Sequence, residues 1–254
     1  DENDVTSADL PSTARAALAA ANGLDGVRIG VPWELNGPGL DDEVQAAVAM
    51  AIERLRQLGA RIVEVSLPSA AHAVPAYYLL ATAEAASNLA RYDGVHFGGR
   101  REHPGGAIAT TTATRSQLFG EEVQLRILLG TFALSHGHSE RFHDAAGRAR
   151  AALRRDFARA FQTCDLLVAP TTPTAAYARG QDRDDPVARC LGDALTVPAS
   201  LAGLPAVSLP CGATADGRPL GLQWIAKPFD EPRLLAAAHV FQQHTDHHLA
   251  RAMP

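Results

Sequence analysis

Between residues 42 and 58, apolar side chains recur at steps of three and four, and a short apolar run stands on either side of this segment. The spacing predicts an amphipathic helix that begins at Asp41 or Asp42 and ends at Gly59. Its apolar positions are Val44, Val48, Ile52, Leu55 and Leu58. The flanking runs, residues 27–31 and 62–67, predict strands. Strand, helix and strand in so short a stretch indicate a βαβ unit with parallel strands, and therefore an α/β fold.

Near the C-terminus the pattern changes to two short apolar runs separated by a turn sequence. Residues 206–209 and 220–225 predict core strands, and Asp216-Gly217 between them is a dipeptide typical of tight hairpin turns. A helix is expected over residues 232–244, with Asp230 at its N-cap. The apolar face expected for this helix consists of Leu234, Leu235, Ala238 and Phe241.

The middle of the chain is predominantly helical. Periodic apolar positions predict helices over residues 75–92, 121–134 and 140–163, followed by a core strand at 166–168. The buried faces expected are Tyr78, Ala81, Ala85 and Leu89 in the first helix, and Ala146, Ala149, Leu153, Phe157 and Phe161 in the last.

The segments between these helices carry turn residues more than apolar periods. Residues 1–22 are polar and predict a surface connector with a short helix, and residues 186–195 predict another short helix. Residues 100–117 contain Gly, Pro and Thr without a clear period, which predicts a long loop. The sequence shows no repeat and no domain boundary, so we expect a single domain.

Composition narrows the class of protein. A hydrophobic content of 46% in 254 residues is ample for a sizeable core, and a net charge of −5 argues against a broad nucleic-acid-binding surface. Cys164, Cys190 and Cys211 are odd in number and lack metal-ligand spacing, which favours buried thiols in a reducing cytoplasm. No apolar run approaches the roughly 20 residues of a membrane span, so we expect a soluble, cytoplasmic protein without membrane contact.

Few motifs in the sequence point to a particular chemistry. The sequence has no G-x-S-x-G nucleophile elbow, and the closely spaced His136, His138 and His143 have no Asp, Glu or Cys partner at metal-ligand spacing. We therefore expect no metal site. The adjacent Glu121 and Glu122 are interpreted as favourable charges in the first turn of a helix.

Several motifs carry a resemblance to a known family. The segments RIGVPWEL, AEAASNLARYDGVHFGGR, FGEEVQLRILLGTFALS, APTTPT and TVPASLAGLPAVSLPCG resemble the C-terminal region of the amidase-signature hydrolases, especially the amidotransferase A subunits that use glutamine. The resemblance covers nearly the whole chain. It implies the C-terminal portion of an amidase-signature fold, a mixed β-sheet flanked by helices on both faces, with residues 1–254 as one partial domain.

The same resemblance implies that the catalytic residues lie outside this chain. Members of the family use two serines and a lysine, partly in a glycine- and serine-rich loop, and the chain has no such loop. Its single lysine, Lys227, stands where the family has a structural turn. DENDVTS resembles the segment that directly follows the catalytic core, so we expect the C-terminal half of a longer enzyme, inactive alone.

Three substrate-binding residues follow from the resemblance. In amidotransferase A subunits, glutamine is recognised by a tyrosine, an arginine and an aspartate whose motifs match Tyr77 in PAYYLL, Arg126 in EVQLRILLG and Asp193 in LGDALTVP. An arginine fork can hold the α-carboxylate, and an aspartate can pair with the α-ammonium. From the residues alone, Arg126 could equally be a helix-surface arginine, Asp193 a capping residue and Tyr77 a packing residue.

The resemblance also implies partners. Glutamine is the expected small-molecule substrate, amidotransferase B and C subunits are the expected protein partners, tRNA contact is indirect, and ATP and Mg²⁺ are expected at a partner subunit. The chain departs from the family at residues 138–143, at Ser200 and at residues 100–117. Two alternatives stay open: part of a free-standing amidase for another amide, and a non-catalytic binding or assembly module derived from the family.

Overall fold

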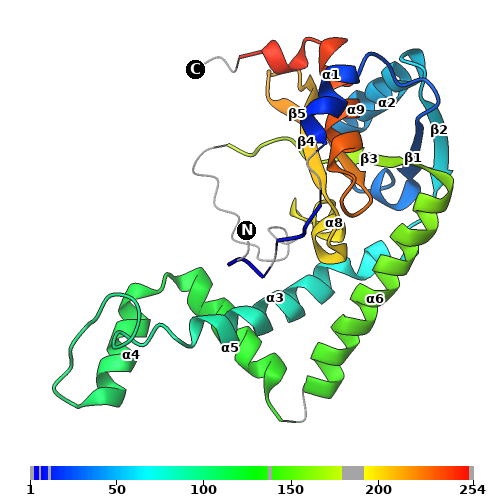
Figure 1. Ribbon diagram of the computed structural model, residues 1–254. Coiled ribbons are helices and arrows are strands. Elements are labelled where there is room, and N and C mark those ends of the chain that lie inside the picture. Colours follow the sequence, from blue (N-terminus) through cyan, green and yellow to red (C-terminus); the bar gives the residue numbers. More distant parts are fainter. Residues whose placement is uncertain (1–2, 6, 11–12, 137–138, 179–191, 252–254) are drawn as a thin grey trace. The chain divides into compact units, whose positions relative to one another are not determined.

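The computed structural model describes residues 3–5, 7–10, 13–136, 139–178 and 192–251 (Figure 1). The chain forms two compact units, which we call the sheet unit (Asp1–Ala71 with Leu153–Pro254) and the helical unit (His72–Ala152). The sequence shows no boundary because the chain enters the helical unit through the short helix η2 (Pro68–His72) and leaves it within the long helix α6 (Ser139–Thr163). The prediction of one partial family domain stays a prediction.

The sheet unit contains a mixed sheet of five strands in the order β2-β1-β3-β5-β4. The strands are β1 (Arg28–Pro32), β2 (Arg61–Val65), β3 (Leu166–Pro170), β4 (Ala206–Ala213) and β5 (Pro219–Ala226). β1 runs parallel to β2 and β3, whereas β5 runs antiparallel to β3 and β4. The predicted βαβ strands and the C-terminal hairpin are therefore confirmed.

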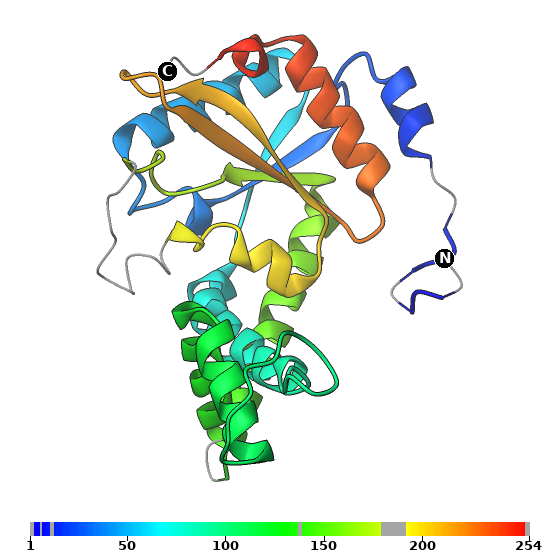
Figure 2. The same cartoon turned by 90° about the vertical axis from the view of Figure 1, so that its left-hand side faces the viewer.

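Helices lie on both faces of this sheet (Figure 2). The described helices of the sheet unit are α1 (Ala14–Ala20), η1 (Trp33–Leu35), α2 (Asp42–Gln57), α8 (Val197–Ala202), α9 (Glu231–Gln243), η3 (His247–Leu249) and most of η2, together with the C-terminal part of α6. α2 and α9 cover one face, where Trp224 of β5 meets Phe241 of α9 edge to face at 5.8 Å between ring centroids. α8 lies on the opposite face. The expected flanked sheet is thus confirmed.

The helical unit consists of α3 (Ala73–Leu89), α4 (Ala107–Leu118), α5 (Glu121–Leu134) and the first part of α6. α3 and α5 pack closely together. A Cβ atom added at Gly130 of α5 would lie 1.9 Å from the carbonyl oxygen of Thr82 in α3, so only glycine permits this approach. The large apolar residues of α5 point away from this contact, because Leu125, Leu128, Leu129 and Phe132 are all exposed.

The prediction of a long loop over residues 100–117 is wrong, because α4 occupies its second half. The inward face of this helix consists of threonines, which is why the sequence lacks an apolar period. Thr110 and Thr114, one turn apart, are buried. Their hydroxyls accept hydrogen bonds from the backbone N–H groups of His103 and Arg101, at 3.1 and 3.0 Å. The threonines therefore hold the preceding loop against the helix.

Two predicted apolar faces also need correction. In α3 the buried residues are Ala73, Ala76, Thr82 and Ala83, whereas the expected Tyr78, Ala81, Ala85 and Leu89 are half-buried. The close approach of α5 through its glycine selects the small residues of α3 for burial. In α9, Leu235 is exposed beside the buried Leu234.

The remaining helix predictions concern the N-cap of α9, the buried face of α6 and residues 186–195. Asp230 occupies the N-cap position of α9, but its carboxylate makes no capping hydrogen bond and pairs with Arg233 at 3.0 Å instead. Within α6, the expected Ala146, Leu153, Phe157 and Phe161 are buried, whereas the expected Ala149 is half-buried. The short helix expected at residues 186–195 lies largely outside the described residues.

Candidate functional site

The helical unit brings together two of the three residues expected to bind substrate. Tyr77 lies in α3 and Arg126 in α5, and the Nη1 group of Arg126 donates a hydrogen bond to the hydroxyl of Tyr77 at 3.3 Å. Both side chains are half-buried, and 33% of the Arg126 side chain is exposed. The guanidinium is therefore fixed by a neighbouring helix while part of it stays accessible to a ligand.

Glu122 and Tyr78 complete the surroundings of this guanidinium. The Nε group of Arg126 donates to Oε1 of Glu122 at 2.9 Å, one helical turn earlier in α5. The guanidinium carbon lies 5.9 Å from the ring centroid of Tyr78, within the range of a cation–π contact. Tyr77 and Tyr78 pack edge to face with their centroids 5.3 Å apart. Four side chains from two helices thus form one cluster.

Arg126 is a permanent cation, as arginine is throughout proteins. The hydrogen bonds to the hydroxyl of Tyr77 and to Glu122 both raise its pKa above the ordinary value, and burial opposes this only in part. A cation that is anchored but partly exposed suits the recognition of an anionic group such as a carboxylate.

The close approach of α3 and α5 explains why the cluster forms. Tyr77 and Thr82 lie five positions apart in α3, and Gly130 lies one turn beyond Arg126 in α5. The Gly130–Thr82 contact therefore sets the distance between the helices near the point where tyrosine and arginine must meet. A register that depends on one glycine is visible in the sequence only as an unexplained Gly inside a helix.

Asp193 belongs to the sheet unit and is exposed. Its backbone carbonyl accepts hydrogen bonds from the N–H groups of Thr196 and Val197, at 3.1 and 3.0 Å, and so closes the turn before α8. Two residues later, the carbonyl of Leu195 accepts a 2.9 Å hydrogen bond from Nε2 of Gln223, a buried residue of β5. The turn that presents Asp193 is therefore tied to the sheet. Tyr77 and Arg126 are in contact within the helical unit, whereas Asp193 belongs to the sheet unit.

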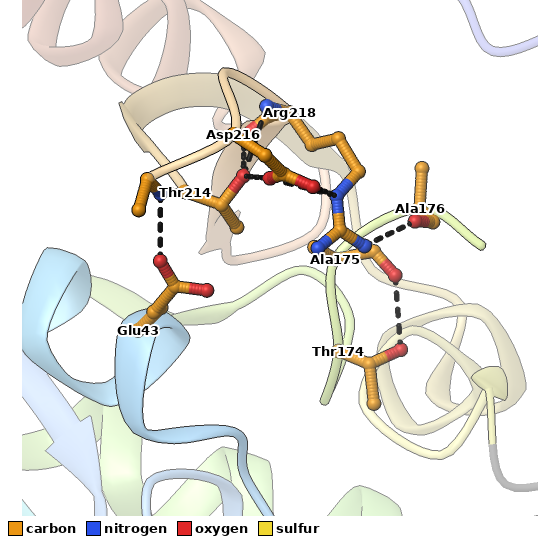
Figure 3. A network of polar contacts seen from close by, with 8 residues as sticks. Glu43, Thr174, Ala175, Ala176, Thr214, Asp216 and Arg218 are labelled. Carbon is orange, nitrogen blue, oxygen red and sulfur yellow. Dashed lines mark hydrogen bonds and ion pairs between the residues drawn. The ribbon is translucent and has the colours of Figure 1, made fainter. Parts of the chain in front are cut away.

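The turn of the β4–β5 hairpin holds a second polar cluster (Figure 3). Arg218 pairs with Asp216 at 2.9 Å and donates to the carbonyl of Ala176 at 2.7 Å, while Glu43 accepts from the N–H of Ala215 at 2.7 Å. Hydrogen bonds from Thr214 first, and then from Arg218, lower the pKa of Asp216. Each polar group is directed at a neighbour in the same unit, so this cluster fixes the hairpin and is not a candidate for chemistry.

Other residues considered in the sequence play structural parts. Lys227 lies in the turn after β5, where its carbonyl accepts a hydrogen bond from the N–H of Asp230 at 3.1 Å. Cys164 and Cys211 are buried free thiols, as expected, and burial raises the pKa of each to about 11. Cys190 and His138 lie outside the described residues.

Metal-binding clusters and membrane-spanning helices are both absent from the described ranges. Over those ranges, no three His, Cys, Asp or Glu side chains are grouped in a way that could hold a metal ion. None of the helices in the same ranges has the length and apolar character needed to cross a membrane.

Glu122 is the member of the site that the sequence interpretation missed. Its place in the first turn of α5 is confirmed, but the structure adds the contact with Arg126. The signal that could have revealed it is the spacing of four residues between a glutamate and a following arginine on one helix.

Comparisons with known proteins give the family. A profile described as Amidase matches residues 1–235. The A subunit of glutamyl-tRNA(Gln) amidotransferase from Symbiobacterium thermophilum is 51% identical over 228 residues, covering 90% of this chain and 46% of that protein. Its counterpart from Moorella thermoacetica, which bears the same name, is 50% identical over 253 residues, covering 99% of this chain and 51% of that protein.

Solved structures agree with this result. The crystal structure of the glutamyl-tRNA(Gln) amidotransferase A subunit from Thermotoga maritima matches with a TM-score of 0.72 at 29% identity, covering 96% of this chain and 48% of that one. A peptide amidase in complex with chymostatin matches with a TM-score of 0.67, also at 29% identity. The match covers 98% of this chain and 50% of the peptide amidase. The chain spans about half the length of the curated relatives named above. With a family profile that matches most of its length and relatives at half identity, the chain belongs to the amidase family.

Proposed function

We propose that this chain is the C-terminal part of the A subunit of a glutamyl-tRNA(Gln)/aspartyl-tRNA(Asn) amidotransferase and contributes the glutamine pocket for ammonia release by amide hydrolysis. The observation that carries the proposal is the hydrogen bond between Arg126 and Tyr77, the two residues whose motifs match the family's glutamine contacts. Relatives at 50% and 51% identity that bear the name of this subunit support it.

The chemistry of the cluster fits an amino-acid substrate. Arg126 has N–H groups in one plane that match the two oxygens of an α-carboxylate, and Tyr77 fixes the plane by accepting from Nη1. An exposed carboxylate such as that of Asp193 is suited to an ammonium group. A simple aliphatic amide has neither charged group, so it would gain nothing from Arg126 or Asp193.

We assign the hydrolytic step to residues outside this chain. The family's two serines and lysine have no counterpart at matching motifs here, so the 254 residues alone should hydrolyse no amide. The chain supplies binding and orientation of glutamine. Ammonia released from the amide is then used on a mischarged tRNA held by a partner.

The assembly follows from the same assignment. We place the chain in the cytoplasm, in a hetero-oligomer with amidotransferase B and C subunits, and we expect tRNA contact to be indirect. ATP and Mg²⁺ belong to a partner subunit in this proposal, and nothing in the recognition of glutamine described above depends on them.

The proposal is tested by titrating L-glutamine into the complete gene product that contains these residues. Arg126→Ala should weaken glutamine binding at least roughly tenfold, because a carboxylate loses its charged, bidentate partner. Arg148→Ala, which removes an exposed arginine of α6, is the matched control and should leave the affinity unchanged. Equal affinity of the Arg126→Ala variant and the wild type would overturn the assignment. Binding of propionamide but not of glutamine would favour a free-standing amidase for another amide.

A further inference from the structure

Only some of the N–H groups of the Arg126 guanidinium have a hydrogen-bond partner among the described residues. Its Nε donates to Glu122 at 2.9 Å, and its Nη1 donates to Tyr77 at 3.3 Å. Nη2 donates to no side chain or carbonyl within the described residues. The donors left for a ligand therefore lie on the two terminal nitrogens.

The position of Glu122 limits how a carboxylate can approach. A carboxylate can form two parallel hydrogen bonds with an arginine either side-on, through Nε and one terminal nitrogen, or end-on, through both terminal nitrogens. Because Oε1 of Glu122 already occupies Nε, the side-on arrangement is closed. The end-on arrangement needs one N–H group from each terminal nitrogen, and Nη1 has a second N–H group besides the one that Tyr77 accepts.

We infer that Glu122 is a positioning residue for the substrate: it holds Nε of Arg126 so that the α-carboxylate of the amino-acid ligand binds end-on, through Nη1 and Nη2. This inference rests on the proposed function, since it takes the carboxylate of glutamine as the ligand of Arg126. Glu122 itself does not touch the substrate. It acts by fixing the rotation of the guanidinium about the arginine side chain.

Two further contacts support a fixed guanidinium over a loose surface pair. Tyr77 holds Nη1 from a second helix, and the ring of Tyr78 lies against the cation at 5.9 Å. Glu122 is thus the third contact of a group that is already held on two sides. The guanidinium therefore has contacts with side chains of both α3 and α5.

The distinguishing experiment compares two ligands in the complete gene product. L-glutamine carries the α-carboxylate, whereas L-glutaminamide carries a neutral amide in its place. Glu122→Ala should weaken L-glutamine binding about fivefold and change L-glutaminamide binding less than about twofold, because only the first ligand uses the oriented fork. Glu122→Gln keeps an acceptor for Nε and should lose less affinity than Glu122→Ala.

Glu121 provides the matched control. It precedes Glu122 in the same first turn of α5 and is exposed, so Glu121→Ala removes the same charge without the contact to Arg126. An equal loss in the Glu121→Ala variant, or an equal loss for both ligands, would show a general effect of charge and would overturn the inference. Should Glu122→Ala fail to fold, as judged by circular dichroism, the ligand comparison with Glu122→Gln decides.

The outcomes also separate this inference from the proposed function. If Arg126→Ala loses glutamine binding while both Glu122 variants bind as the wild type does, Glu122 is only a surface partner and the glutamine pocket stands. If Arg126→Ala binds glutamine normally, the pocket itself is wrong, and the role of Glu122 falls with it.

Discussion

Arg126 donates a hydrogen bond from Nη1 to the hydroxyl of Tyr77 at 3.3 Å across 49 residues of sequence. This bond joins α5 to α3 through a hydroxyl acceptor, while the ion pair of Nε with Glu122 partly balances the positive charge of the arginine. The phenol also packs edge to face on Tyr78, which restricts its own rotation. The two residues therefore fix the orientation of one another.

Removal of one oxygen atom tests this relationship. Tyr77→Phe keeps the ring and its packing but leaves Nη1 of Arg126 without its acceptor, so the affinity for L-glutamine should fall roughly three- to tenfold. Tyr92→Phe, in the same unit, is the control and should bind normally. Titration calorimetry measures both, and unchanged affinity of the Tyr77→Phe variant would refute the contribution of the hydroxyl.

The Gly130–Thr82 contact predicts an unusually sensitive glycine. Gly130→Ala places a Cβ atom 1.9 Å from the carbonyl oxygen of Thr82, so α5 must move and the free energy of unfolding should fall by about 1–3 kcal/mol or more. Gly147→Ala in α6 meets no atom within 4 Å and should stabilise the protein by about 0.5–1 kcal/mol. Urea unfolding of both variants gives the comparison. Equal stabilities would contradict the close approach of α3 and α5.

The ion pair between Asp165 and Arg28 predicts a pH dependence of stability. The guanidinium of Arg28 donates to both carboxylate oxygens, at 2.8 and 3.2 Å, and this lowers the pKa of Asp165 from 3.8 to about 2. A folded-state pKa below the unfolded value stabilises the protein fully above about pH 4, and this stabilisation is lost as the pH falls toward 2.

Asp165→Asn should therefore lower the free energy of unfolding by about 1–2 kcal/mol at pH 7, with the difference shrinking below pH 4. Asp246→Asn, at an exposed position, serves as the control. Urea unfolding at several pH values measures the difference. A stability loss that does not depend on pH between 2 and 5 would show that charge is not the cause.

The exposed apolar face of α5 predicts that the isolated 254 residues associate with other apolar surfaces. Leu125, Leu128, Leu129 and Phe132 are 46%, 68%, 45% and 54% exposed and recur at helical spacing. The chain should bind a hydrophobic dye or self-associate, and Leu128→Gln with Leu129→Gln should reduce both. Leu249→Gln, outside this face, should not. A monodisperse, cooperatively unfolding monomer that binds no dye would contradict this expectation.

The sequence predicted best where one apolar period dominates. The helix α2 and the hairpin that contains Asp216 and Gly217 were both predicted, because their patterns depend on local spacing and turn chemistry. The helix α4 was missed because its buried face is made of threonines that hydrogen-bond to a loop. Polar side chains facing inward give no hydrophobic period.

The residues of the candidate site also divide into those that a local sequence pattern can indicate and those that it cannot. Tyr77, Arg126 and Asp193 could be named only through a family resemblance, since each residue alone has an ordinary structural explanation. Spacing within one helix could have indicated the pair of Glu122 and Arg126. The contact between Tyr77 and Arg126 depends on the packing of two helices through Gly130, and no local pattern encodes that.

Ammonia release from L-glutamine by the complete gene product tests the central claim most directly. The account predicts that the wild type releases ammonia from glutamine and that Arg126→Ala raises KM for glutamine roughly tenfold or more, with little change for a neutral aliphatic amide. The 254 residues alone should release none. Glutamine hydrolysis that is unaffected by Arg126→Ala, or hydrolysis by the 254 residues alone, would contradict the account.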